Sequence, residues 1–288
     1  MNIWENLVSL HSDKEWSDEN LTPARSYLEQ QNGEVQWDLH RFPLERSLDN
    51  DPSPIPKTEH REGYYGPNHF NYWASGLRDI CQILEWTEKN GVNIKSSLDI
   101  GCATGRIVRH LKAQLNFDSV LGCDINRLHV EWVNSFLPGV AAFQNSSIPS
   151  LPLPDASVDF VSAFSLFTHI EAFETAWLFE IKRVLKPGGI AWITVHSDRI
   201  WRELQPDWPL YAGVGGHPLY AKIKAEHGDS LPSNRFVLRW HENTSYSSNV
   251  FYQQDYLFKV WSKIMPIVDF FPAIPHFQDV LVMRKPAS

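Results

Sequence analysis

Cysteine is scarce in this chain of 288 residues, which contains only Cys81, Cys102 and Cys123. The three are widely spaced, odd in number and set in apolar or glycine-containing segments. Disulfide frameworks and zinc sites use paired or closely spaced cysteines, so the sequence indicates neither. We therefore expect a reducing compartment and a cytoplasmic protein.

Long apolar runs are missing as well, because no stretch approaches the roughly 18 uninterrupted apolar residues of a membrane-spanning helix. The start of the chain also differs from a signal peptide, which has a basic start and an unbroken apolar stretch. Its short apolar runs are interrupted by Glu5, Asp13, Lys14 and Glu15. We expect no membrane partner.

Clusters of basic residues are equally absent. The net charge is −8, and no Lys/Arg cluster reaches five residues. Such a chain has no global field that would attract a phosphate backbone or an acidic membrane surface, so nucleic acid is not an expected partner. With 43% hydrophobic and 21% charged residues, the composition is nevertheless that of a folded globular protein.

Residues 1–72 differ in character from the remainder. They are rich in Pro, Asp, Glu and Trp, and the segment Asp51–Pro56 is typical of an extended, helix-resistant connector. We predict an N-terminal arm or lid over residues 1–72 and one domain over residues 73–288. A segment at about 200–235 is rich in Trp, Tyr and His, and we interpret it as an insertion into that domain.

Short apolar runs alternate with helical patterns from residue 73 onward. Apolar residues from Trp73 recur at steps of three and four, which predicts a helix ending at Asn90. Strands are expected at 97–100, 120–123, 158–164 and 190–195, with helices at 107–115, 128–136 and 173–185. This alternation predicts an α/β fold with a doubly wound, mostly parallel sheet, whose ligands bind beyond the carboxyl ends of the strands.

Three further strand-like runs lie near the end of the chain, at 236–240, 267–271 and 279–283. No full helical crossover separates the last two, so they are expected to form an antiparallel terminal hairpin at the sheet edge. Together with the four earlier strands, these runs predict a seven-stranded sheet.

The segment Leu98–Arg106 (LDIGCATGR) predicts a strand that ends in a small-residue turn and opens a helix. Gly101 lets the backbone turn and a ligand approach, and Gly105 lets the helix start pack on the strand, where its amino terminus can hold a carboxylate. Nineteen residues past Gly105, Asp124 ends the next strand and is placed to accept hydrogen bonds from ribose hydroxyls. The dinucleotide fingerprint G-x-G-x-x-G fails at Ala103 and Arg106, which weakens a pyrophosphate interpretation.

The turn resembles the first motif of class I S-adenosylmethionine-dependent methyltransferases, of the D-x-G-x-G-x-G type, with Ala103 in place of the middle glycine. Gly122–Ile125 looks like the ribose-binding second motif, and Phe160–Ile170 like the fourth-strand motif. Leu185–Gly189 resembles the turn before the fifth strand. The resemblance covers about residues 95–200 and implies a Rossmann-like fold that binds S-adenosyl-L-methionine.

The resemblance also implies a set of cofactor contacts, although several of these residues have a structural alternative. Asp99 could orient the turn or touch the ligand, and Asn145, with Ser146, could contact adenine or satisfy its own loop. Tyr65, from the arm, could cover the sulfonium by cation–π contact or pack the arm to the core. The expected cofactor-binding residues are Asp99, Gly101, Ala103, Gly105, Asp124, Ile125, Asn145, Ser146, Phe164 and Tyr65.

On the acceptor side, Thr168 and Glu171 form a capping-box pattern that predicts His169 as the first residue of a helix just past the fourth strand. A helix amino terminus disfavours imidazolium, so His169 would be neutral and able to take a proton, unless it is a structural histidine. His196, followed by Asp198, is the second candidate base. An acceptor that is already nucleophilic needs only positioning. No metal is predicted, because these side chains lack a recognised ligand spacing.

The expected function is therefore methyl transfer to a small molecule, with the insertion at about 200–235 as a cap over the acceptor site. A sugar or metabolite hydroxyl is the first choice of acceptor and a small thiol the second. A nicotinamide-dependent oxidoreductase and a non-catalytic cofactor-binding protein remain as alternatives. Ser162–Ser165 stands where base-modifying amino methyltransferases carry an Asn-Pro-Pro-Tyr type of motif, which also argues against DNA. The Trp-rich arm could grip a second subunit in a homo-oligomer.

Overall fold

The computed structural model describes residues 9–11, 16, 21–61, 64–240, 248–272 and 277–287. The chain divides into two compact units. One comprises Ser9–Asn145, and the other comprises the described chain from Ser146 onward.

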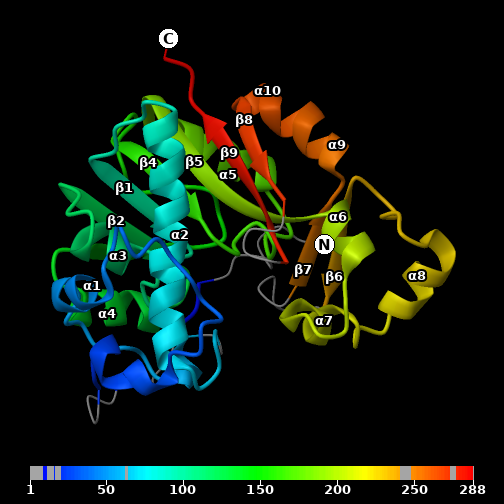
Figure 1. Ribbon diagram of the computed structural model, residues 1–288. Helices are drawn as coiled ribbons and strands as arrows, with labels where there is room; N and C mark the ends of the chain where they lie inside the picture. The colour runs from blue at the N-terminus through cyan, green and yellow to red at the C-terminus, as the bar shows by residue number, and fades with distance from the viewer. Residues whose placement is uncertain are drawn as a thin grey trace. The chain divides into compact units, whose positions relative to one another are not determined.

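The Ser9–Asn145 unit contains three parallel strands in the order β3-β2-β1. They are β1 (Ser96–Ile100), β2 (Ser119–Asp124) and β3 (Ala141–Gln144). Helix α3 (Val108–Ala113) connects β1 to β2, and α4 (Arg127–Phe136) connects β2 to β3 (Figure 1). The predicted βαβ alternation is confirmed. Strand β3 was not predicted, because its four residues are partly exposed and carry no strong apolar signal.

The long helix α2 (His69–Lys89) precedes the first strand and is the cyan helix in Figure 1. It begins four residues before the predicted Trp73, because Asn68 caps it by accepting a hydrogen bond from the Asn71 N–H at 2.8 Å. Gly76 permits a close approach to the turn after β1. A Cβ at this position would lie 2.1 Å from the Arg106 carbonyl oxygen, so only glycine fits.

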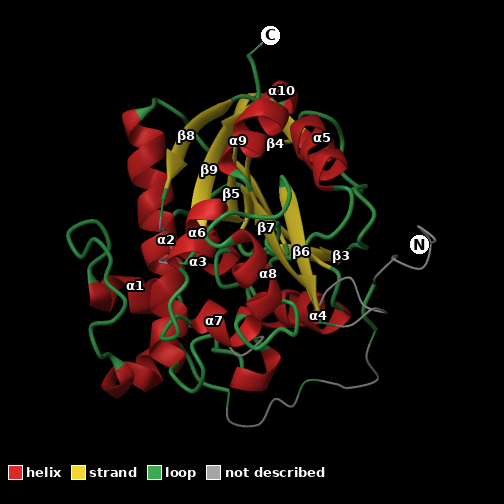
Figure 2. Cartoon of the chain, turned by 90° about the vertical axis from the view of Figure 1, so that its right-hand side faces the viewer, coloured by secondary structure: helices red, strands yellow, loops and turns green. Residues whose placement is uncertain are grey.

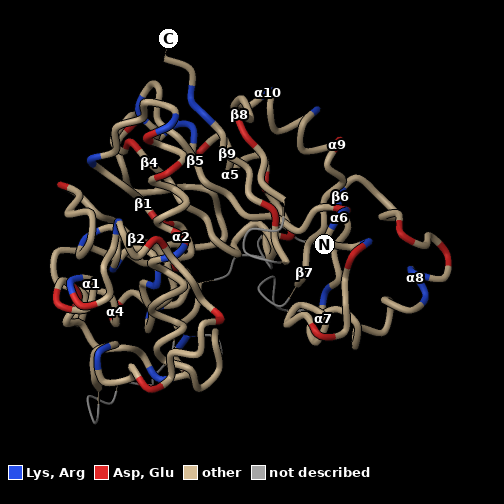
Figure 3. The backbone as a smooth tube through the Cα atoms, viewed as in Figure 1, with Lys and Arg blue, Asp and Glu red and all other residues tan. Residues whose placement is uncertain are grey.

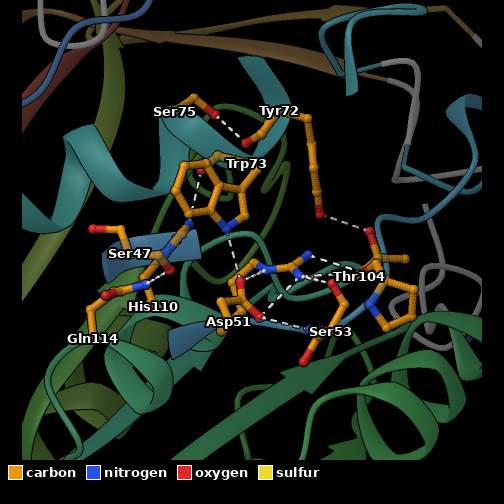
Figure 4. A network of polar contacts seen from close by, with 11 residues as sticks. Ser47, Asp51, Ser53, Tyr72, Trp73, Ser75, Thr104, His110 and Gln114 are labelled. Carbon is orange, nitrogen blue, oxygen red and sulfur yellow. Dashed lines mark hydrogen bonds and ion pairs between the residues drawn. The ribbon is translucent and has the colours of Figure 1, made fainter. Parts of the chain in front are cut away.

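The arm residues of this unit are attached to α2 and α3 through a buried polar network (Figure 4). Short helices in the arm are η2 (Ala24–Gln30), α1 (Leu44–Asn50) and η3 (Thr58–His60). Asp51 accepts hydrogen bonds from Trp73 Nε1 at 2.9 Å and from Arg109 Nε at 2.6 Å. Arg109 also donates to the Ser53 carbonyl at 2.9 Å. The segment Asp51–Pro56 is thus anchored by an ion pair shielded from water.

The second unit contains β4 (Val158–Ala163), α5 (Glu174–Val184) and β5 (Leu185–Ser197), with β4 and β5 parallel. Strand β9 (Asp279–Arg284) runs antiparallel to both β5 and β8 (Ile267–Phe271). Figure 2 shows β8 and β9 as the terminal hairpin. The predicted fold class is confirmed: α/β, mostly parallel, with an antiparallel end.

Two more strands extend this unit. Strand β7 (Ser248–Tyr252) pairs in parallel with the last residues of β5, and β6 (Arg235–Arg239) pairs antiparallel with β7. Only β6 was predicted, so with β3 and β7 the described chain has nine strands, two more than the seven expected. Every residue of β7 is buried, although it starts with Ser248 and Asn249, so its burial depends on its neighbours and not on its own polarity pattern.

The insertion at about 200–235 forms a small apolar core together with β6 and β7. Its helices are α6 (Asp198–Glu203), α7 (Pro209–Val214) and α8 (Tyr220–His227). The buried cluster consists of Ile200, Trp201, Leu204, Leu210, Val214, Leu231, Leu238 and Phe251. Trp201 is fully buried in this core. This aromatic residue of the insertion thus has a packing role.

The chain then continues through α9 (Gln254–Tyr256), the π-helix η4 (Leu257–Trp261) and α10 (Ser262–Ile264). Acidic and basic residues are interspersed in each unit (Figure 3). Among the residues that the structure describes, no helix is long and apolar enough to cross a membrane.

Candidate functional site

The turn after β1 depends on positive φ angles, with Gly101 at +73° and Gly105 at +85°. The N–H groups of Gly101 and Cys102 both donate to the Cys123 carbonyl, at 2.8 and 3.0 Å. A Cβ at Gly105 would lie 2.3 Å from Leu137 Cδ1, so glycine is required there. The turn is therefore tied to the carboxyl end of β2, as the spacing of the motif predicts.

Asp124 links this turn to the loop after β2. Its Oδ2 accepts the Ala103 N–H at 2.9 Å, and its Oδ1 accepts the Asn126 N–H at 2.8 Å. His129 Nδ1 lies 3.3 Å from Oδ1. A carboxylate offers about four lone-pair sites, so Asp124 retains acceptor capacity for hydroxyl donors. This remaining acceptor capacity fits a ribose hydroxyl, the partner that the motif predicts for Asp124.

Ala103 occupies the place of the middle glycine with φ at +45°. The left-handed region costs a non-glycine residue roughly 1–2 kcal/mol, so the departure from the motif strains the turn without changing its course. Because the Ala103 N–H points at Asp124, the strained residue also contributes a bond to the site.

Arg106, at the position of the third fingerprint glycine, binds helix α2. Its Nη1 donates to Asp79 Oδ2 at 2.6 Å, and both side chains are largely buried. The Arg106 guanidinium also lies 5.3 Å from the centre of the Tyr64 ring. Tyr65, half-buried with φ at +60°, packs its ring 5.6 Å from that of Tyr64. Tyr64, with Tyr65 packed against it, thus lies beside Arg106, the residue after the glycine turn.

The arm also reaches the second motif, which sequence reasoning missed. The Leu10 N–H donates to the Ile125 carbonyl at 2.7 Å, and the Arg127 N–H donates to the Leu10 carbonyl at 3.0 Å. Gln144 Nε2 lies 3.0 Å from each of three acceptors, namely Ser9 Oγ, Leu10 O and Ile125 O. No motif marks Gln144 or Leu10, because Leu10 lies more than a hundred residues from its partners and Gln144 bonds to the equally distant Ser9 and Leu10.

The remaining expected cofactor residues fall in both units. Asp99 is buried at the end of β1, and the Asn145 N–H, just after β3, donates to the Asp124 carbonyl at 3.0 Å. Ser146 starts the second unit, where its Oγ accepts the Ile148 N–H at 3.4 Å. Phe164 is half-buried directly after β4. Asp99 is the penultimate residue of β1, Asn145 and Ser146 follow the carboxyl end of β3, and Phe164 follows that of β4, the ends at which open α/β sheets bind ligands.

The prediction that His169 begins a helix is wrong. Helix α5 starts at Glu174, after Phe173 with φ at +65°. The capping box does not form, because the Glu171 carboxylate instead accepts hydrogen bonds from the Ser248 hydroxyl and the Arg239 guanidinium. His169 therefore does not lie at a helix amino terminus, which was the expected reason for a neutral imidazole.

His169 is held in a different way, on the loop between β4 and α5. Its Nδ1 lies 2.6 Å from the Ser248 carbonyl oxygen. Because a carbonyl oxygen can only accept, Nδ1 carries the proton of the neutral ring and Nε2 carries the lone pair. The ring is thereby set in the tautomer that can accept a proton at Nε2.

His196, at the end of β5, is buried. Burial, with a smaller contribution from His169, lowers the pKa of His196 to about 3. Within the described chain, neither ring nitrogen has a hydrogen bond of ordinary geometry, and the Val250 backbone is a weaker polar neighbour. Asp198, its expected companion, accepts the Gln254 N–H at 3.1 Å. His196 is thus a weak base in an apolar setting.

No group of three or more His, Cys, Asp or Glu side chains in the described ranges is placed to hold a metal ion. His169 is half-buried, and its contact with the Ser248 carbonyl sets the position of its nitrogen lone pair.

A family model described as a methyltransferase domain matches residues 98–193. A sterol 24-C-methyltransferase from Gibberella zeae is 28% identical over 191 residues, covering 60% of this chain and 48% of that protein. A probable S-adenosylmethionine-dependent methyltransferase from Mycolicibacterium smegmatis is 30% identical over 162 residues, covering 55% and 58%. The chain thus spans about half the length of the curated relatives it matches.

Solved structures resemble the chain at lower identity. A 1,6-didemethyltoxoflavin-N1-methyltransferase from Burkholderia thailandensis has a TM-score of 0.49 and 14% identity, covering 77% of this chain and 83% of that one. An S-adenosylmethionine-dependent methyltransferase from Methanosarcina mazei has a TM-score of 0.48 and 18% identity, covering 70% and 98%. At these identities the likeness concerns the fold alone.

Proposed function

We propose that this chain transfers the methyl group of S-adenosylmethionine to a small-molecule acceptor, since residues 98–193 match the model of a methyltransferase domain and the curated relatives that it resembles are methyltransferases. The observation that carries the proposal is the bond between the Ala103 N–H and Asp124 Oδ2. It joins the glycine turn and the ribose-type carboxylate into one ligand-binding edge.

The cofactor would be held through its adenosine and methionine parts. Asp124 accepts from the ribose hydroxyls, and Gly101 leaves the backbone open to a closely approaching ligand. The further contacts proposed are Asp99, Ala103, Gly105, Ile125, Asn145, Ser146, Phe164 and Tyr65. Arg106 argues against a dinucleotide, because its side chain occupies the third-glycine position and is committed to Asp79.

We assign the acceptor as a hydroxyl, on a sugar or a similar small metabolite. A hydroxyl is a weak nucleophile near neutral pH and gains from a general base, which typically contributes about 10²–10⁴-fold. His169 presents such a base through Nε2. His196 is the poorer choice, because burial lowers its pKa to about 3.

Bound S-adenosylmethionine supplies an electrophilic methyl group on a sulfonium sulfur. His169 Nε2 would take the proton of the acceptor hydroxyl, and S-adenosylhomocysteine would be the product that remains after methyl transfer. The Nδ1–H of the resulting imidazolium remains bonded to the Ser248 carbonyl, which stabilises the positive charge.

The proposal is tested first by calorimetric titration with S-adenosylhomocysteine and with NADH. Binding of S-adenosylhomocysteine alone is expected, and binding of NADH alone would overturn the proposed cofactor. Binding without any turnover would indicate a cofactor-binding protein that has no transferase activity.

The acceptor class is tested by transfer of labelled methyl to sugar hydroxyls, phenols, carboxylates, thiols and amines. We expect label on a hydroxyl and its loss in His169→Ala. Label on a thiol that survives His169→Ala would show that positioning suffices and that the assigned base is wrong.

A further inference from the structure

The loop that carries His169 is bound to the β6–β7 hairpin along most of its length. The Val250 N–H donates to the Thr168 carbonyl at 2.8 Å, and the Tyr252 hydroxyl donates to the Phe167 carbonyl at 3.1 Å. Arg235 Nη2 donates to the Ile170 carbonyl at 3.2 Å. The carbonyls on both sides of His169 are thus held by residues more than sixty positions further along the chain.

One residue of the hairpin, Ser248, contacts both His169 and Glu171. Its carbonyl oxygen accepts from His169 Nδ1, and its hydroxyl donates to the Glu171 carboxylate. Ser248 is fully buried, and the Glu171 side chain is only 3% exposed. The Ser248 backbone is paired with Arg239 in the β6–β7 ladder, and the bond to Glu171 holds the Ser248 side chain, so the two together fix the direction of the Ser248 carbonyl.

The Glu171 carboxylate is in turn paired with Arg239 of β6. A buried carboxylate is costly without a partner, and breaking such a pair by removing one side typically destabilises a protein. The Arg239 guanidinium therefore supplies the counterion that the buried Glu171 carboxylate needs.

We infer that Glu171 and Ser248 are positioning residues for the proposed base: through the Ser248 carbonyl they hold His169 as the Nδ1–H tautomer, with Nε2 free of its proton. The inference rests on the proposed function for its catalytic consequence, but the tautomer itself is a property of the protein alone. Glu171 acts on His169 through Ser248, and it contacts no reacting atom in this scheme.

The first test reads the tautomer without any acceptor. Histidine ¹⁵N-labelled full-length protein is examined by long-range ¹H–¹⁵N spectroscopy, and the His169 signals are assigned with His169→Gln. We expect protonated Nδ1 in the wild type and a mixture of both tautomers in Glu171→Gln and in Ser248→Ala. A wild-type ring protonated at Nε2, or an unchanged Nδ1–H tautomer in both variants, would overturn the inference.

The matched control is Glu174→Gln. Glu174 lies three residues further on and is 12% exposed, and its polar partners are the Tyr256 hydroxyl at 2.8 Å and Arg235 Nε at 3.8 Å. The same change of a carboxylate to an amide there should leave the His169 tautomer as in the wild type. A tautomer mixture in Glu174→Gln equal to that in Glu171→Gln would mean that any loss of charge in this region disturbs the ring, which contradicts a specific route through Ser248.

The second test uses turnover. Glu171→Gln should lower kcat about tenfold to a hundredfold, a part of the general-base contribution, while KM for S-adenosylmethionine changes less than about twofold. Glu171→Asp, which keeps the charge, should recover part of the loss. A full kcat in Glu171→Gln, with the tautomer lost, would refute the catalytic consequence of the inference. If instead His169→Ala retains hydroxyl methylation, the proposed base fails, while the tautomer measurement still decides the positioning role.

Discussion

The buried ion pair between Asp51 and Arg109 should be a large single contribution to the stability of the Ser9–Asn145 unit. The two side chains are 2% and 1% exposed, and Asp51 also accepts the Trp73 indole N–H. Asp51→Asn keeps the size of the side chain but leaves the Arg109 charge buried without a counterion. Removing one partner of such a pair typically costs about 3–5 kcal/mol.

A matched control lies two residues away. Asp49 is 73% exposed and pairs with Arg25, which is 42% exposed. Water screens that pair, so Asp49→Asn should change the free energy of unfolding by about 0–1 kcal/mol. The assay is urea unfolding at pH 7, followed by circular dichroism, on the two variants and the wild type. A difference between the variants below about 1 kcal/mol would refute the reasoning.

The pair also has a defined pH dependence. Burial alone would raise the pKa of Asp51, but the charge and hydrogen bonds of Arg109 more than offset it, so the pKa is lowered from its ordinary value of 3.8. The stabilisation is therefore present above the unfolded-state pKa and is lost as pH falls through the lower folded-state pKa. The gap between wild type and Asp51→Asn should persist at pH 5 and narrow below about pH 4. A double variant with apolar residues at both positions, Asp51→Leu/Arg109→Met, should recover most of the loss, since a buried pair is often replaceable as a unit.

Three further outcomes are expected. Asp124→Asn should weaken S-adenosylhomocysteine binding, measured by calorimetry, by about tenfold to a hundredfold, because charge-assisted hydrogen bonds contribute about 1.5–3 kcal/mol each. Asp118 is exposed, so Asp118→Asn should bind as the wild type does. Ala103→Gly, which relieves the positive φ of +45°, should raise the free energy of urea unfolding by up to about 1 kcal/mol, and a loss of stability would contradict the strain argument. Burial lowers the pKa of His110 from 6.5 to about 4. As the pH falls, the His110 imidazole is therefore protonated in the unfolded chain first, and this difference should lower the free energy of unfolding by about 3 kcal/mol between pH 6.5 and 4. The slope in that window should be shallower in His110→Gln and unchanged in the exposed His40→Gln.

Much of the fold and of the cofactor side could be predicted because its signals are local. The glycine turn, the strand before it and the carboxylate after the next strand are encoded within about thirty residues. The structure joins them as the spacing implies, with the Ala103 N–H bonded to Asp124. Positive φ at Gly101 and Gly105 follows directly from residue type.

The acceptor side could not be predicted in the same way. The pattern of Thr168 and Glu171 favours a capping box when only neighbours in the chain are considered. In the structure, Glu171 bonds to Ser248 and Arg239, partners that lie 77 and 68 positions away. A buried carboxylate gains more from a guanidinium and a hydroxyl than from one backbone N–H, so these bonds replace the cap and the helix starts later.

The sequence by itself therefore determined the α/β class, the βαβ order and the turn with its paired carboxylate, because periodicity and residue type act over a few residues. Only the tertiary structure decided the tautomer of His169, the burial of His196, the contact of Leu10 with Ile125 and the ion pair of Asp51. Each of these depends on which distant group supplies a hydrogen bond, a charge or shelter from water, and no local pattern encodes that partner.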